Sequence, residues 1–121
     1  CKMIRRKEEQ QIVNIEKPQN GEGILTLKKI LNGPEELDQK GRAFNHCFLN
    51  PGSGLGYHQH IGTTETMYIL KGTAKYVDED GNETILNLGD VTFTDDGQGH
   101  SIYATGNELL EFIALVLFKN S

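Results

Sequence analysis

Glycine is the residue that most constrains how this chain folds, because 14 of its 121 residues are glycines and they divide it into short segments. The segments between them have alternating or mixed apolar character, which is typical of an all-β domain. Asp80 and Gly81, followed by Asn82, predict a hairpin turn, since these residue types adopt positive φ at low cost. We expect strands at residues 11–15, 24–30, 43–49, 55–60, 66–71, 73–79, 83–87, 91–94, 100–105 and 109–118.

One segment departs from this pattern. Residues 33–40, GPEELDQK, resemble a helical turn, with Pro34 where a first helical residue would lie. The chain length fits one domain with one sizeable core, and no internal repeat, low-complexity tract or linker interrupts it. We therefore expect a single all-β domain over residues 1–121.

Charge and hydropathy exclude two classes of partner. The formal charge is −5 and the basic residues are scattered, so no concentrated positive face is available for nucleic acid. The one basic cluster, residues 5–7, is interpreted as a solvated chain end. The longest apolar stretch, residues 109–118, is interrupted by Glu111 and is too short to span a membrane.

Cysteine usage indicates a reduced compartment. Cys1 and Cys47 are too few for a disulfide scaffold, so we expect a cytoplasmic protein. Met3 is expected to be the natural start, with Cys1 and Lys2 added before it, although a mature lipoprotein also begins with cysteine. Cys47 is interpreted as a buried small hydrophobe rather than a nucleophile, because no basic residue on its own strand face would lower its pKa.

The last expected strand, residues 109–118, is apolar on both faces. A strand with one face in water should alternate between apolar and polar residues, and this one does not. Either the N-terminal strands cover its outer face or a second copy of the protein does. The second alternative, which we favour, predicts a homodimer.

Three histidines and one glutamate are candidate metal ligands. His58 and His60 lie two positions apart on an expected strand, so their side chains share one face. Glu65 begins the next strand and would lie across from them if the two strands form a hairpin. His100 is a fourth candidate from a distant segment. Imidazole nitrogen and carboxylate oxygen are ligands shared by Fe, Mn, Zn, Ni and Cu, so the spacing leaves the ion open.

The spacing around these residues resembles the signatures of the cupin superfamily. Residues 52–72 match the first signature, G-x5-H-x-H-x4-E-x6-G, at every position, and residues 89–104 resemble the second, G-x5-P-x-G-x2-H-x3-N. In the second signature, Asp95 replaces the proline and Ala104 the asparagine. The short interval between the signatures is similar to that of small prokaryotic cupins.

This resemblance implies a conical double-stranded β-helix, or jelly-roll β-barrel, with its core at about residues 43–118 and N-terminal strands within residues 1–42. It also implies that His58, His60, Glu65 and His100 bind one divalent transition-metal ion, namely Mn, Fe, Zn or Ni. The two departures affect the turn before His100 and a supporting hydrogen bond rather than the ligands.

Strand parity then suggests residues of the pocket. Met67 and Ile69 should face inward with Glu65, and Ile102 and Ala104 with His100. Phe93 and Phe112 are candidates for an aromatic wall, or for ordinary core. His46 is a candidate base or substrate contact if its strand face points inward, which the sequence leaves open.

Two functions are compatible with such a site. The first is a metal-dependent enzyme of dioxygenase or isomerase type, in which an ion with two open positions polarises a small polar metabolite. The second is a non-catalytic module that binds or senses a small ligand through the metal. A titratable residue beside the open metal positions would favour the enzyme, and a sealed apolar pocket would favour binding.

Overall fold

The computed structural model describes residues 3–119, so the expectation about Cys1 and Lys2 lies outside the described residues. The fold is all-β, as expected. Short 3-10 helices occur at Lys7–Glu9 (η1), Pro18–Asn20 (η2) and Pro34–Leu37 (η3). The strands are β1 (Ile12–Glu16), β2 (Ile24–Leu31), β3 (Gly41–Leu49), β4 (Gly54–Gln59), β5 (Thr63–Lys71), β6 (Thr73–Val77), β7 (Glu83–Leu86), β8 (Val91–Thr94), β9 (Gly99–Thr105) and β10 (Leu110–Phe118).

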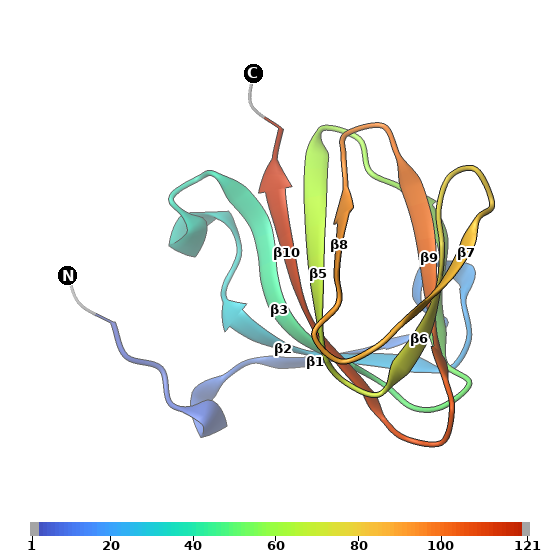
Figure 1. Cartoon of the computed structure of the whole chain (residues 1–121). Coiled ribbons are helices and arrows are strands. Elements are labelled where there is room, and N and C mark those ends of the chain that lie inside the picture. The colour runs from blue at the N-terminus through green and yellow to red at the C-terminus, as the bar shows by residue number, and fades with distance from the viewer. Residues whose placement is uncertain (1–2, 120–121) are drawn as a thin grey trace.

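These strands form two antiparallel sheets that face each other as a jelly roll (Figure 1). One sheet has six strands in the order β1-β2-β3-β10-β5-β8, and the other has four in the order β4-β9-β6-β7. Every strand expected from the sequence is present, with ends shifted by a few residues. The expected turn at Asp80–Gly81 joins β6 to β7, and Asp78 Oδ1 accepts hydrogen bonds from the backbone N–H groups of Asp80 and Asn82.

The core lies between the sheets and follows the two-residue period of the strands. On β10, the side chains of Leu110, Phe112, Ala114 and Val116 are buried, whereas those between them are half-buried. Burying a side chain the size of Phe112 or Leu49 contributes roughly 1.5–3 kcal/mol. The core cluster consists of Leu25, Cys47, Leu49, Met67, Ile69, Ala74, Leu86, Ile102, Ala104, Leu110, Phe112 and Ala114.

The N-terminal strands extend the larger sheet and do not cover its outer face. β1 pairs with β2, and β2 pairs with β3 on the side away from β10. The alternative in which these strands cover the outside of β10 is therefore wrong.

The basic cluster near the start of the chain is only partly solvated, which corrects the expectation for Arg5. Its guanidinium donates to both carboxylate oxygens of Glu36, at 3.0 and 2.8 Å, and to the carbonyl of Ile30. The N-terminal segment is thereby fixed to the loop that contains η3. Arg6 and Lys7 are exposed, as expected.

Two glycines, Gly21 and Gly56, allow the backbone around η2 to pack directly on β4. A Cβ atom at Gly21 would overlap the carbonyl of Gly54, and one at Gly56 would overlap the carbonyl of Gln19. Glu22 and Gly54 also exchange two backbone hydrogen bonds, at 3.0 and 2.9 Å. Strand β4, which carries His58, is therefore fixed by backbone contacts with the N-terminal segment.

Candidate metal centre

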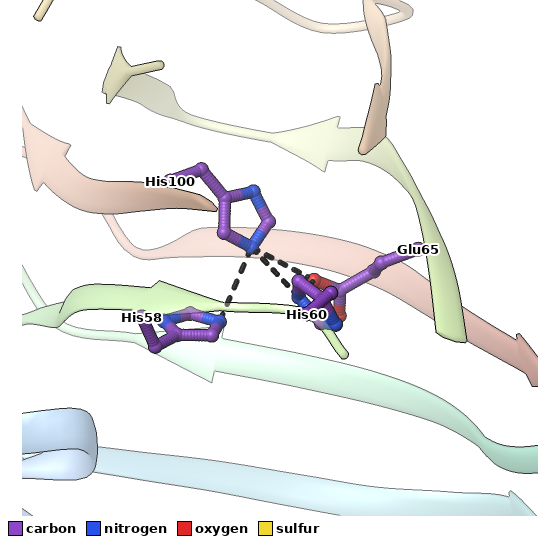
Figure 2. Close-up of side chains that lie close together, drawn as sticks. All are labelled: His58, His60, Glu65 and His100. Carbon is purple, nitrogen blue, oxygen red and sulfur yellow. Dashed lines mark hydrogen bonds and ion pairs between the residues drawn. The ribbon is translucent and has the colours of Figure 1, made fainter. Parts of the chain in front are cut away.

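Four side chains point toward one another between the two sheets (Figure 2). His58 lies on β4, His60 just beyond its end, Glu65 on β5 and His100 on β9. One ligand atom from each lies within 4.8 Å of the others. The structure thus brings together the four residues that the sequence suggested as ligands, from three strands and one turn.

The way Glu65 reaches this group differs from the expected hairpin. β4 and β5 belong to different sheets, so Glu65 enters from the sheet opposite the histidines. His58 pairs instead with His100, directly across β4 and β9. The hairpin expectation was wrong because adjacent strands joined by a short turn cross between the sheets here rather than pair.

Each histidine ring has a partner for its Nδ1 atom. His58 Nδ1 lies 2.8 Å from the carbonyl oxygen of Gly56, and since a carbonyl can only accept, Nδ1 carries the proton and Nε2 the lone pair. His60 Nδ1 lies 3.3 Å from Thr63 Oγ1. Metal-binding histidines in proteins are oriented in this way by a partner on the second ring nitrogen.

The Nε2 atoms meet at the centre of the group. His100 Nε2 lies 3.1 Å from His60 Nε2 and 3.2 Å from His58 Nε2. Glu65 Oε1 is 3.0 Å from Nε2 of both His60 and His100, yet it is buried and makes no hydrogen bond of good geometry. A buried carboxylate oxygen facing three imidazole nitrogens fits a divalent transition-metal ion, for which these are suitable ligands.

Burial and charge set the protonation of the group. Burial alone raises the pKa of Glu65, but the contacts with His100 and His60 outweigh it and hold the pKa at about 2. Burial lowers the pKa of His58. Both effects favour the forms that bind metal, an ionised carboxylate and a neutral ring.

The apolar residues suggested for the pocket are buried in the core. Met67, Ile69, Ile102 and Ala104 are buried, as parity predicted for residues that share a face with a ligand, and Phe112 is part of the same buried core. His58 is the most accessible of the four candidate ligands, so the group is approached from its side.

Two other pocket candidates project away from the group. Phe93 borders a neighbouring hollow, but its side chain is 62% exposed and pairs with Thr66 on the outer face of the sheet. The prediction of an inner aromatic wall at Phe93 is wrong because the inner positions of β8 belong to Thr92 and Thr94.

His46 also lies on the outer face. Its Nε2 atom is 2.9 Å from Glu111 Oε1, and its ring packs against Phe48. The inner face of β3 carries Cys47 and Leu49 instead, so His46 is not placed to contact a substrate at the metal group. Burial, followed by the charge of Glu65, raises the pKa of Cys47, which agrees with a buried hydrophobe rather than a nucleophile.

Two residues near the group were missed by sequence reasoning. Tyr76 Oη lies 2.8 Å and Thr94 Oγ1 3.0 Å from His100 Nδ1, and the two hydroxyls are 2.9 Å apart. Burial raises the pKa of Tyr76, so its hydroxyl stays protonated. Both residues border a hollow of about 390 Å³ between β8 and the β6–β7 hairpin. No local signal marks them, because they reach His100 through strand pairing and sheet packing.

Comparison with known proteins identifies similar chains. The family model described as Cupin domain matches residues 45–117. An oxalate-binding protein of Thermotoga maritima is 40% identical over 97 residues, which cover 80% of this chain and 78% of that protein.

Solved structures show the same architecture. The crystal structure of a predicted oxalate decarboxylase from Thermotoga maritima has a TM-score of 0.90 and 37% identity, and covers 97% of this chain and 100% of that one. A sugar phosphate isomerase from a cupin superfamily, from Silicibacter pomeroyi, has a TM-score of 0.74 at 16% identity, and covers 97% of this chain and 76% of that one. At 16% identity, the similarity to the sugar phosphate isomerase shows a shared fold alone. No helix in residues 3–119 is long and apolar enough to cross a membrane.

Proposed function

Because this chain belongs to the cupin family, we propose that His58, His60, Glu65 and His100 hold one divalent transition-metal ion and that this centre binds a small chelating carboxylate of the oxalate class. The observation that carries the proposal is the convergence of the four ligand atoms within 4.8 Å. An ion bound there supplies a Lewis-acidic centre with positions open to two carboxylate oxygens.

The chain's own residues support recognition through the ion. Among residues 3–119, the buried polar and charged side chains are Ser53, His60, Thr63, Glu65, Thr94, His100 and Ser101. This set contains no lysine or arginine that could neutralise a carboxylate directly. The Thermotoga maritima matches, described as an oxalate-binding protein and as a predicted oxalate decarboxylase, agree with an oxalate-like ligand.

The same buried polar and charged residues favour binding of oxalate over its chemical conversion. Conversion of oxalate to formate and CO₂ breaks the carbon–carbon bond and requires one proton at the carbon that becomes formate. Apart from the candidate ligands, no acid or base belongs to the buried polar set of the described chain. An enzyme remains the second candidate function, because His58 is partly accessible and leaves an approach for substrate and water.

The proposal is tested by calorimetric titration of oxalate into protein loaded with Mn²⁺ or Zn²⁺, into chelator-stripped protein and into the loaded His46→Ala variant. We expect binding to the loaded wild type and to His46→Ala, with none to the stripped protein. Acetate, which has one carboxylate, should bind much more weakly. Equal oxalate binding with and without metal would contradict the proposal. Formate and CO₂ produced from oxalate, measured with and without O₂, would favour the enzyme.

The partner proposal concerns the outer face of the larger sheet. Ile113 and Leu115 of β10 are half-buried there, and Tyr68, Val91 and Phe93 on the adjacent strands are exposed. These apolar side chains form a continuous surface over β10, β5 and β8, since β5 pairs with both of the other strands. We propose that a second copy of the chain covers this surface in a homodimer.

A further inference from the structure

The ring of His100 is contacted on its Nδ1 side by hydroxyl groups from both sheets. Tyr76 belongs to β6, which pairs with β9 in the four-stranded sheet. Thr94 belongs to β8 in the six-stranded sheet. The distances of 2.8 and 3.0 Å are those of hydrogen bonds, and the hydroxyls also contact each other at 2.9 Å. His100 is fully buried, so these hydroxyls take the place of solvent at its Nδ1 atom.

The opposite side of the same ring faces the candidate metal group. His100 Nε2 lies within 3.2 Å of two other imidazole nitrogens, and 3.0 Å from Glu65 Oε1. A neutral imidazole carries one proton and one lone pair, so the proton on one nitrogen decides what the other can do. If Nε2 held the proton, it would be directed at Glu65 and His100 could not act as a ligand.

We propose that Tyr76 and Thr94 act together as positioning residues for His100, accepting its Nδ1–H and so directing the Nε2 lone pair into the metal site. This inference rests on the proposed metal function. For His58 a carbonyl, which can only accept, performs the same task. Two hydroxyls can also donate, so for His100 the orientation depends on both of them being present.

The strand register explains why Thr94 can perform this role. Thr94 pairs directly with Glu65 across β5 and β8, with both side chains on the inner face. In this pair, Glu65 is itself a candidate ligand, and Thr94 orients another candidate ligand, His100, which belongs to the opposite sheet. Thr92, two residues earlier on the same face, borders the same hollow, but within residues 3–119 the hydroxyls bonded to His100 Nδ1 are those of Tyr76 and Thr94 and not that of Thr92. It is a matched control.

The test compares wild type with a Tyr76→Phe/Thr94→Val double variant, with Thr94→Ser and with Thr92→Val. Protein labelled with ¹⁵N at histidine reports the tautomer of His100 through long-range ¹H–¹⁵N correlations in the metal-free state. Zn²⁺ affinity is measured by competition with a chromophoric chelator. Far-UV circular dichroism and thermal melting establish that each variant is folded.

We expect metal-free wild type, Thr94→Ser and Thr92→Val to carry the His100 proton on Nδ1. The double variant should lose this preference and bind Zn²⁺ about 10- to 100-fold more weakly, the usual loss when a group supporting a metal-binding histidine is removed. The proposal is overturned if the folded double variant keeps the Nδ1–H tautomer, or if its affinity equals that of wild type. A wild type that holds the tautomer but binds no Zn²⁺ would contradict the metal function alone.

Discussion

His60 and His100 direct their Nε2 atoms at each other at 3.1 Å, although 40 positions separate them in the chain. Two neutral rings can share at most one proton across this contact, and Glu65 adds a carboxylate to the same point.

The first prediction follows from this arrangement. The His58→Ala/His60→Ala variant should lose stoichiometric metal, falling from about one ion per chain to background in elemental analysis. His46→Ala, on the outer face, should retain it. Undiminished metal in the double variant would refute the assignment.

The second prediction concerns two glycines of the first signature, Gly52 and Gly72, which have φ of +86° and +84°. A Cβ at Gly72 would lie 2.6 Å from the carbonyl oxygen of Leu109, whereas one at Gly52 would meet no atom of residues 3–119 within 4 Å. Gly52→Ala should destabilise the fold by about 1–2 kcal/mol through backbone strain alone. Gly72→Ala should cost more because steric overlap adds to a similar strain. Urea unfolding measures both, and an equal loss in the two variants would contradict this account.

The third prediction concerns Arg5 and Glu36. The hydrogen bonds from Arg5, followed by that from the backbone of Asn32, lower the pKa of Glu36 from its ordinary value of 4.5. A carboxyl group with a lower pKa in the folded protein stabilises the fold at any pH above its pKa in the unfolded chain. This stabilisation is lost as the pH falls through the pKa of the folded state.

Arg5→Ala should therefore show a modest fall in Tm at neutral pH, and the difference from wild type should shrink as the pH drops below 4.5. Arg6→Ala removes the same charge from an exposed position and should have little effect. A pH-independent difference between wild type and Arg5→Ala would indicate that packing, not the ion pair, is responsible.

The fourth prediction tests the outer face of the larger sheet. Sedimentation of the wild type at micromolar concentration should give a dimer. Ile113→Lys places a charge within the proposed interface and should shift the protein to monomers. Leu88→Lys is the control, because Leu88 is 70% exposed in the turn between β7 and β8. A monomeric wild type would show that the apolar surface is not an interface between copies.

The strands could be predicted because their signals are local. Glycines at positive φ, the Asp80–Gly81 turn and the two-residue period each act within a few residues of sequence, and all ten expected strands appear in the described chain. The face of a strand was also predictable wherever one ligand fixed it. Met67 follows Glu65 by two positions and Ile102 follows His100 by two, and both are buried with them.

The remaining features depend on pairing between distant segments. The sequence places β5 directly after β4, but no local pattern states that the chain crosses to the other sheet between them. His46 and Phe93 could not be assigned a face because no ligand lies on β3 or β8. Tyr76 and Thr94 reach His100 only after two sheets have formed and packed, so neither spacing nor residue type distinguishes them from ordinary strand residues.

The close packing of Gly21 on Gly54 bears on the order of events during folding. Gly54 of β4 exchanges two backbone hydrogen bonds with Glu22, and the segment between these two residues contains both β2 and β3. Closing so long a connection is costly in chain entropy until those strands have paired. We therefore expect the two histidines carried with β4 to reach their final positions late in refolding. Metal added at the start of refolding should leave the early kinetic phases unchanged and act only on the final step.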